Sequence, residues 1–242
     1  MAHRKAEKEA LRREREEREQ RARSQQQRKR LVGYGGGGLL VIAAILVAVF
    51  LVGSGGDGGG SEEASNLFPE GGSVPEQRVF DYEQAIEASG CELSSTEGRG
   101  ERDRLHTRST DVDVDYRDNP PTLGRHWPPG FEAEDGLYAR APADESLVHT
   151  LEHGRVIIWV KPSLSEQARS SLRALFDEDS YQLVMVPRRN MDAPLVATAW
   201  NGQPTPGGTG RTLTCERWNP DVVEALRAFR DEHRSNGPEP VP

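Results

Sequence analysis

The sequence lacks most of the motifs that identify a cofactor or an enzyme class. Only two of its 242 residues are cysteines and they form no Cys-x-x-Cys pair, which argues against a thioredoxin-like redox motif. After residue 67 it contains no Gly-x-Gly-x-x-Gly, no P-loop and no Gly-x-Ser-x-Gly. No pair of carboxylates can be singled out for glycoside chemistry. Function must therefore be read from other features.

Charge is missing from one long stretch. Residues 31–56 contain no Asp, Glu, Lys or Arg, and their most apolar part is Leu39–Val52. A helix needs about 20 largely apolar residues to cross a bilayer core. We therefore predict a transmembrane helix over residues 31–53. A cleaved signal peptide is the alternative, but the charged leader would be unusually long and no clear small-x-small cleavage site follows Val52.

The charges on either side of this segment predict its orientation. Residues 1–30 form a helix-prone basic tail of about +6, which leaves −14 for the rest of a chain whose formal net charge is −8. By the positive-inside rule the tail is cytoplasmic and the remainder lies outside the plasma membrane. The lipid bilayer is then the predicted partner of the helix, and an envelope protein partner stays unidentified. The acidic remainder disfavours binding to nucleic acid.

The part outside is expected to be one α+β domain. Residues 54–67 have the Gly/Ser-rich composition of a flexible linker, residues 68–237 have folded composition, and residues 238–242 are expected to be a disordered C-terminus. Helices are predicted at 80–89, 166–176 and 220–234, and strands at 155–160, 182–186 and 195–200. Because these helices and strands do not alternate in a regular βα repeat, we assign the domain to the α+β class.

Local patterns refine these elements. Ser163 and Glu166 have the spacing of a capping box, and Asn219-Pro220 that of a helix start. Asp111, Asp113 and Asp115 alternate with valines, which indicates an exposed strand face more than a calcium loop.

The two cysteines, Cys91 and Cys215, both fall in the predicted outside domain. An even number of cysteines in an oxidising compartment favours a disulfide bond. We predict that they are joined.

Histidine is the most specific signal. Four of the six histidines lie within 48 positions: His106, His126, His149 and His153. His126 lies in a Pro- and Gly-rich run, and a short helix over 145–153, stopped by Gly154, would put His149 and His153 on one face. Imidazoles suit copper and zinc, so these four residues are the predicted metal ligands, with Glu152 orienting an imidazole. Met191, and less so Met185, could add a soft ligand for copper.

Two alternatives stay open. The run His149-x-x-Glu152-His153 also matches the inverted zincin motif, which would make the chain a zinc hydrolase with Glu152 as general base and Glu224 as a further ligand. In the other, the histidines hydrogen-bond within a polar core, and the domain is a non-catalytic interaction module of the cell envelope. An enzyme is the less favoured of these classes.

The same region resembles a bacterial family, the domain of unknown function 3105. The matching motifs, spread over Gly90 to Glu239, are Tyr116, Asn119–Thr122, Gly124, His126, Gly136–Tyr138, Leu147–Gly154, Ile157–Trp159, Ala199-Trp200, Cys215 and Phe229–Asp231. His106 stands where such proteins often have another histidine, whereas Leu123 replaces a more usual Ser. The resemblance implies a membrane-anchored, extracytoplasmic protein and supplies no reaction.

Overall fold

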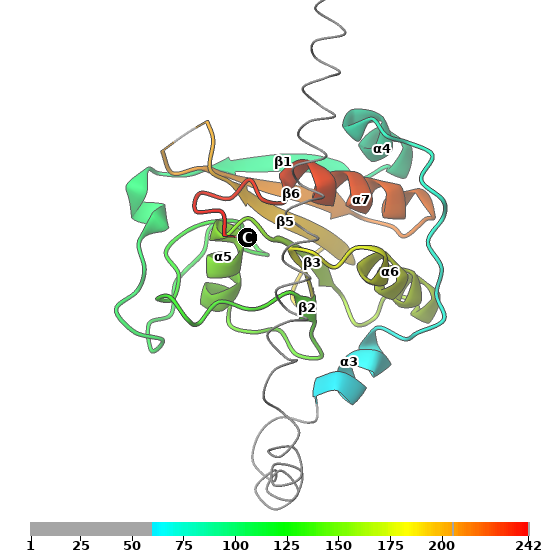
Figure 1. The fold of residues 1–242 in the computed structure, drawn as a ribbon, viewed down its shortest axis with the longest axis horizontal. Coiled ribbons are helices and arrows are strands. Elements are labelled where there is room, and N and C mark those ends of the chain that lie inside the picture. The colour runs from blue at the N-terminus through cyan, green and yellow to red at the C-terminus, as the bar shows by residue number, and fades with distance from the viewer. Residues whose placement is uncertain (1–59, 205, 242) are drawn as a thin grey trace, which may run out of the picture. The chain divides into compact units, whose positions relative to one another are not determined.

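The computed structural model describes residues 60–204 and 206–241. The chain divides into two units, Met1–Asp57 and Gly58–Pro242, and the described residues belong to the second. This unit has the α+β architecture predicted from the sequence (Figure 1). The predicted tail and transmembrane helix, residues 1–53, lie outside the described part of the chain. Within that part, no helix has the length and apolar character needed to cross a membrane.

Six strands form one mixed sheet in the order β1-β6-β5-β3-β4-β2. Their bounds are β1 Glu92–Glu97, β2 Gly136–Leu137, β3 Val156–Val160, β4 Leu183–Pro187, β5 Leu195–Asn201 and β6 Thr209–Cys215. The strands β1, β6, β5 and β3 pair antiparallel, whereas β3, β4 and β2 pair in parallel. A sheet with both kinds of pairing needs no regular alternation of strand and helix.

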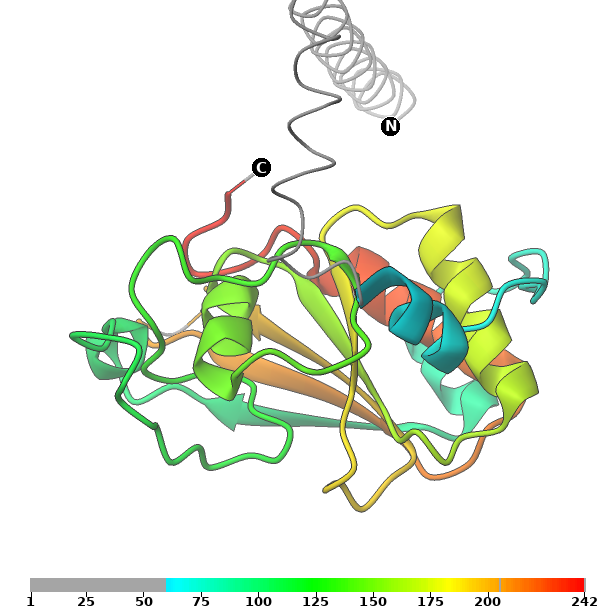
Figure 2. The ribbon, with the colours of Figure 1, turned by 90° about the horizontal axis from the view of Figure 1, so that it is seen from below.

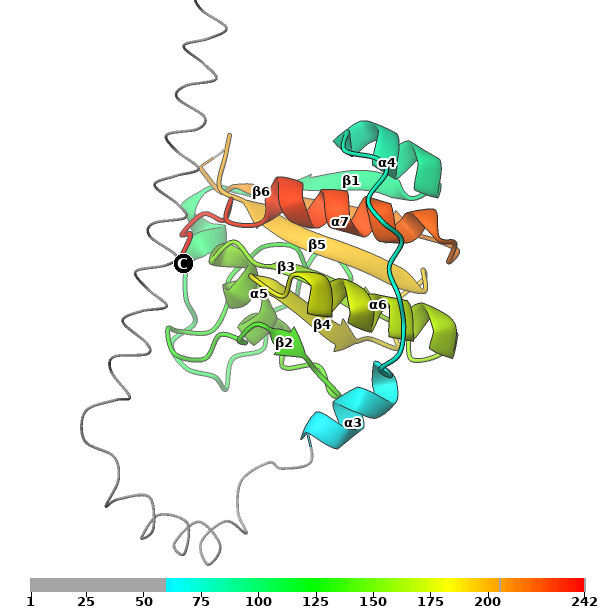
Figure 3. The ribbon, with the colours of Figure 1, turned by 45° about the vertical axis from the view of Figure 1, so that its right-hand side comes forward.

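Each face of the sheet carries its own hydrophobic core. Helices α4 (Tyr82–Ser89), α6 (Glu166–Glu178) and α7 (Asp221–His233) pack on one face, and α5 (Asp144–Glu152) packs on the other (Figure 2, Figure 3). Successive side chains of β3 point to opposite faces, so Ile158 joins the first core and Trp159 the second. Burial on both sides explains why this strand is an unbroken apolar run in the sequence.

Most helix boundaries follow the predicted signals, but the start of α6 and the end of α5 differ. Gly90, at φ 67°, ends α4 as expected. The start of α6 is capped by Ser165, which accepts a hydrogen bond from the backbone N–H of Ala168, and not by Ser163. The reason is a turn: the N–H of Leu164 bonds the carbonyl of Lys161, which leaves Ser163 outside the helix. At the start of α7, the side-chain oxygen of Asn219 accepts a hydrogen bond from the backbone N–H of Asp221.

Three strands, β1, the two-residue β2 and β6, were not expected, and one expected strand is absent. The edge strand β1 is largely exposed, and β6 is rich in Thr and Gly, so neither has the apolar pattern of a typical strand. Residues 111–115 keep their alternating exposure but pair with no strand. Instead the N–H of Val114 bonds the carboxylate of Glu145 on α5.

The ends of the domain are more ordered than their composition suggests. Residues 60–67 of the predicted linker form helix α3 (Gly60–Leu67), because the chain that follows places Phe68 fully inside the first core. At the other end, where a disordered C-terminus was predicted, the backbone N–H groups of Glu239 and Val241 donate to the carbonyls of Glu152 and His153 at the end of α5. The predicted disulfide is confirmed: Cys91 bonds Cys215 and joins the start of β1 to the end of β6.

Candidate metal centre

Helix α5 supplies two side chains to the site. His149 and Glu152 are one turn apart, and both are almost fully buried. The helix ends immediately afterwards, because Gly154 adopts φ 86°, where a Cβ would be strained, and its N–H bonds the carbonyl of Leu151. Residues three apart on a helix lie on the same face. The imidazole and the carboxylate therefore point into the same space.

Two loop histidines complete the group. His106 follows the short 3-10 helix η1 (Glu101–Arg104), and His126 follows the Pro- and Gly-rich run. A β-bridge sets the two residues side by side, and the N–H of Thr107 bonds the carbonyl of His126 at 2.6 Å. The ring of His126 is fully buried, whereas the side chain of His106 is 32% exposed. The site is thus closed on three sides and reaches the surface at His106.

The four side chains converge on one small volume. One potential ligand atom from each of His106, His126, His149 and Glu152 lies within 4.8 Å of every other. The three imidazole centroids are 4.8 to 5.0 Å apart, and Oε2 of Glu152 lies 2.9 Å from Nε2 of His126 and 4.0 Å from Nε2 of His106. Such convergence of buried polar groups calls for a bound partner.

All four converging atoms lack a hydrogen bond. Among the described residues, Nε2 of His106, Nε2 of His126, Nδ1 of His149 and Oε2 of Glu152 are buried and have no hydrogen-bond partner. The pair His126–Glu152 is close enough for a hydrogen bond but is not aligned for one. Native proteins leave few buried polar atoms unsatisfied, and four such atoms that face one another could hold a metal ion.

The imidazoles of the group can direct nitrogen lone pairs towards one another. Nδ1 of His126 lies 2.8 Å from the carbonyl of Gly124 and must donate to it, so the neutral ring has its lone pair on Nε2. Burial and the neighbouring imidazoles lower the pKa of His149 to about 4. Burial, together with His126, also lowers the pKa of His106. Both rings are then neutral at pH 7 and able to bind a metal.

The carboxylate of Glu152 is ionised. Burial raises its pKa, but contact with His126 and the charges of the other imidazoles outweigh that effect and lower it overall. The site therefore offers three imidazole nitrogens and one anionic oxygen.

The sequence was compared with known proteins. The profile of the family described as "Protein of unknown function (DUF3105)" matches residues 107–242, more than half of the chain. The chain belongs to this family. The matched region contains His126, His149 and Glu152 and begins one residue after His106. No curated protein and no solved structure matches the chain.

Of the four histidines predicted as ligands in this DUF3105 chain, His153 is not in the converging group. Its ring lies 4.7 Å from that of His149, but its Nδ1 donates to the carbonyl of Glu239 at 2.9 Å. Glu152, predicted to orient an imidazole or to act as the general base of a hydrolase, stands in its place.

The residue roles of an inverted zincin differ from this arrangement. That motif uses both histidines as ligands and leaves the glutamate as a base, whereas here Glu152 faces the imidazoles and His153 does not. The proposed further ligand, Glu224, accepts hydrogen bonds from the backbone of Arg78 and from Arg227, away from this group. Met185 and Met191 are buried in the two hydrophobic cores.

Two charged residues beside the group were missed from the sequence. Nε of Arg104 lies 3.7 Å from Oε1 of Glu152, the oxygen that does not face His126. Glu132, on a loop held to α5 by Thr150, lies 4.0 Å from Nδ1 of His149. Nothing in the local sequence connects either residue to the histidines, because both contacts depend on how the loops fold over α5.

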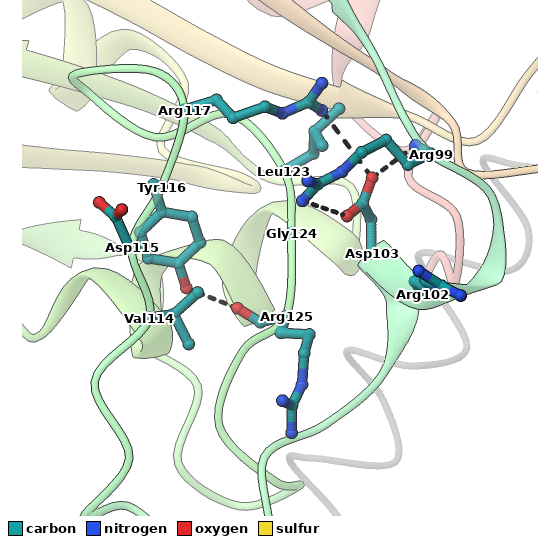
Figure 4. Close-up of a pocket in the computed structure, with 10 residues that line it drawn as sticks. All are labelled: Arg99, Arg102, Asp103, Val114, Asp115, Tyr116, Arg117, Leu123, Gly124 and Arg125. Atoms are coloured by element: carbon teal, nitrogen blue, oxygen red, sulfur yellow. Dashed lines mark hydrogen bonds and ion pairs between the residues drawn. The ribbon is translucent and has the colours of Figure 1, made fainter.

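A separate cavity of about 320 Å³ lies beyond the loop that carries His126. Figure 4 shows that its walls are largely charged and that Asp103 is held between Arg99 and Arg117. Tyr116 donates to the carbonyl of Arg125 and closes one side. Its lining includes none of the four converging residues, so the cavity is a neighbour of the site and not part of it.

Proposed function

We propose that this domain binds one divalent transition-metal ion through His106, His126, His149 and Glu152. The observation that carries the proposal is that all four converging atoms are buried, have no hydrogen-bond partner and face one another. If the histidines served only to satisfy a polar core, their inward nitrogens would be paired. This argues against the view that the domain is an interaction module with purely structural histidines.

The donor set favours zinc or copper. Three imidazole nitrogens and one carboxylate oxygen suit borderline metals such as Zn²⁺ and Cu²⁺, whereas Mg²⁺ and Ca²⁺ prefer sites made of oxygen. Tetrahedral zinc with bonds of about 2.0–2.1 Å brings its ligand atoms to about 3.3 Å from one another. The largest present separation, 4.8 Å, would contract by about 1.5 Å around the ion. Four protein ligands would complete such a shell, which suits binding, storage or delivery of metal more than hydrolysis.

We also propose that the domain works outside the membrane, tethered by the helix predicted at residues 31–53. The disulfide Cys91–Cys215 supports this location, since such bonds persist in oxidising compartments. Protease added to intact cells should degrade the domain and spare the tail. Protection of the domain until the membrane is opened would contradict the proposed topology.

Metal content tests the proposed site directly. The full-length protein is stripped with chelator, titrated with Zn²⁺ or Cu²⁺, and analysed by mass spectrometry for bound metal. We expect one equivalent, which is lost in His126→Ala and retained in His153→Asn. The asparagine amide can replace Nδ1–H as donor to Glu239, so this variant removes the imidazole and leaves the hydrogen bond. Equal loss in both variants would restore His153 as a ligand, and no uptake by the parent would refute a metal centre.

A further inference from the structure

The C-terminal segment Gly237–Val241 runs back along the end of α5 that carries the candidate ligand Glu152 (Figure 1, Figure 2). The N–H of Glu239 bonds the carbonyl of Glu152 at 3.0 Å, and the N–H of Val241 bonds the carbonyl of His153 at 3.5 Å. These two carbonyls belong to the last turn of a helix, which has no partners of its own for them. The segment therefore satisfies the end of the helix on which the site depends.

Side chains add to this backbone attachment. His153 donates through Nδ1 to the carbonyl of Glu239, which accounts for its place beside the site but outside the converging group. Gly237 is buried, and a Cβ at this position would overlap the carbonyl oxygen of Glu152. A glycine is required here because the two backbones touch, and not because of an unusual φ angle.

Arg104 connects the segment to the ligand carboxylate itself. Its Nη2 donates to the carbonyl of Pro238 at 3.1 Å, and its Nε lies 3.7 Å from Oε1 of Glu152. The guanidinium thus forms an ion pair with one carboxylate oxygen, while Oε2 is directed at His126 and His106. A ligand whose free oxygen is fixed before the metal arrives loses less conformational freedom on binding.

We propose that Arg104 and the docked segment Gly237–Val241 position Glu152 for metal binding. This inference rests on the metal site proposed above. It makes Arg104 a positioning residue and the last residues of the chain a functional part of the centre. Because coupling of this kind is reciprocal, metal binding should also hold the segment more firmly in place.

The test compares metal affinity with metal-free stability in the full-length chain. Four variants are made: termination after Asn236, Gly237→Ala, Arg104→Gln and Arg104→Lys. Termination leaves intact the hydrogen bonds of Ser235 and Asn236 to Gly154 and Gly202. The control is Gly136→Ala, where a Cβ makes only an ordinary contact of 3.6 Å with the ring of Tyr138. Zinc affinity is measured by competition with a chelating dye.

We expect the first three variants to bind zinc about 10- to 100-fold more weakly, the usual effect of removing groups that orient a ligand. Arg104→Lys should recover part of the loss, the control should match the parent, and the metal-free unfolding midpoints should change little. In the parent, zinc should slow hydrogen exchange at the amide of Glu239.

Three other results would overturn the inference. Unchanged affinity in the truncated chain, with the parent still binding zinc, would refute the role of the segment and leave the metal site intact. A parent that binds no zinc would refute the metal site, and the positioning role with it. Weaker binding that follows a matching loss of metal-free stability, without slower exchange at Glu239, would make the segment merely structural.

Discussion

The substitution Glu152→Gln separates a metal ligand from a structural carboxylate. The side chain is 1% exposed, and glutamine keeps its size while removing its charge. In the metal-free protein the carboxylate lies near three imidazoles and at 3.7 Å from Arg104, without an aligned hydrogen bond at Oε2. A neutral amide relieves the burial of this charge. We therefore expect metal-free stability to change by less than about 1 kcal/mol.

Metal-dependent stability should behave differently. A ligand that binds only the folded state stabilises it by about 2.7 kcal/mol when present at 100 times its Kd. For a domain of roughly this size, 1 kcal/mol shifts the melting temperature by about 2–4 °C, so zinc should raise the Tm of the parent by about 5–11 °C. Loss of the anionic ligand should weaken binding at least about 100-fold, which removes most of this shift at the same zinc concentration.

The assay is thermal unfolding with and without zinc, followed by circular dichroism. Glu134→Gln is the matched control, since it removes the same charge from an exposed side chain outside the converging group. A Glu152→Gln variant that keeps the full zinc shift would show that the carboxylate is not a ligand. A metal-free loss of about 3–5 kcal/mol would instead identify a buried ion pair needed for folding.

Two further predictions concern the domain without metal. Burial, with a smaller contribution from Arg211, lowers the pKa of His233 from 6.5 to about 4. Between these two values the unfolded chain binds more protons than the folded chain, so stability decreases as the pH is lowered from 6.5 towards 4. Through this group the free energy of unfolding, measured with urea, should decrease by about 2 kcal/mol between pH 7.5 and pH 5. If the free energy of unfolding of His233→Gln fell with decreasing pH as steeply as that of the parent, the assignment would be contradicted. Replacing Cys91 and Cys215 together by alanine should lower the unfolding free energy by up to about 5 kcal/mol, because their bond closes a loop with a sequence separation of 124. An unchanged urea midpoint in that double variant would show that the bond does not constrain the unfolded chain.

The parts of the fold that could be predicted are those in which one residue type dominates. The strand Val156–Val160 is apolar throughout because both faces of the sheet are covered, and helix α7 has an apolar stripe and a proline at its start. In contrast, β1 and β6 lie towards one edge of the sheet and contain mostly polar residues, so nothing in their local sequence distinguishes them from loops. Their pairing becomes visible only through the disulfide, which joins Cys91 to Cys215.

The candidate site was predictable in composition but not in detail. Four clustered histidines predicted a metal centre, and the fold brings His106, His126 and His149 together. Contacts made across long sequence distances could not be foreseen, among them that of Arg104 with Glu152 and that of the C-terminal segment with α5. The polar C-terminus reads as disordered because its backbone, more than its side chains, makes the contacts.

Glu152, and not His153, faces the other candidate ligands because helix α5 ends at Glu152. Positions 149 and 153 share a face only if the helix continues through both, but α5 ends at Glu152 and His153 is its C-cap, with φ −78° and ψ 8°. The left-handed Gly154 then turns the chain away, and the imidazole of His153 meets the carbonyl of Glu239. The pair three residues apart, His149 and Glu152, stays within the helix and faces His126. A glycine directly after a predicted ligand should therefore shift attention from the i,i+4 residue to the i,i+3 residue.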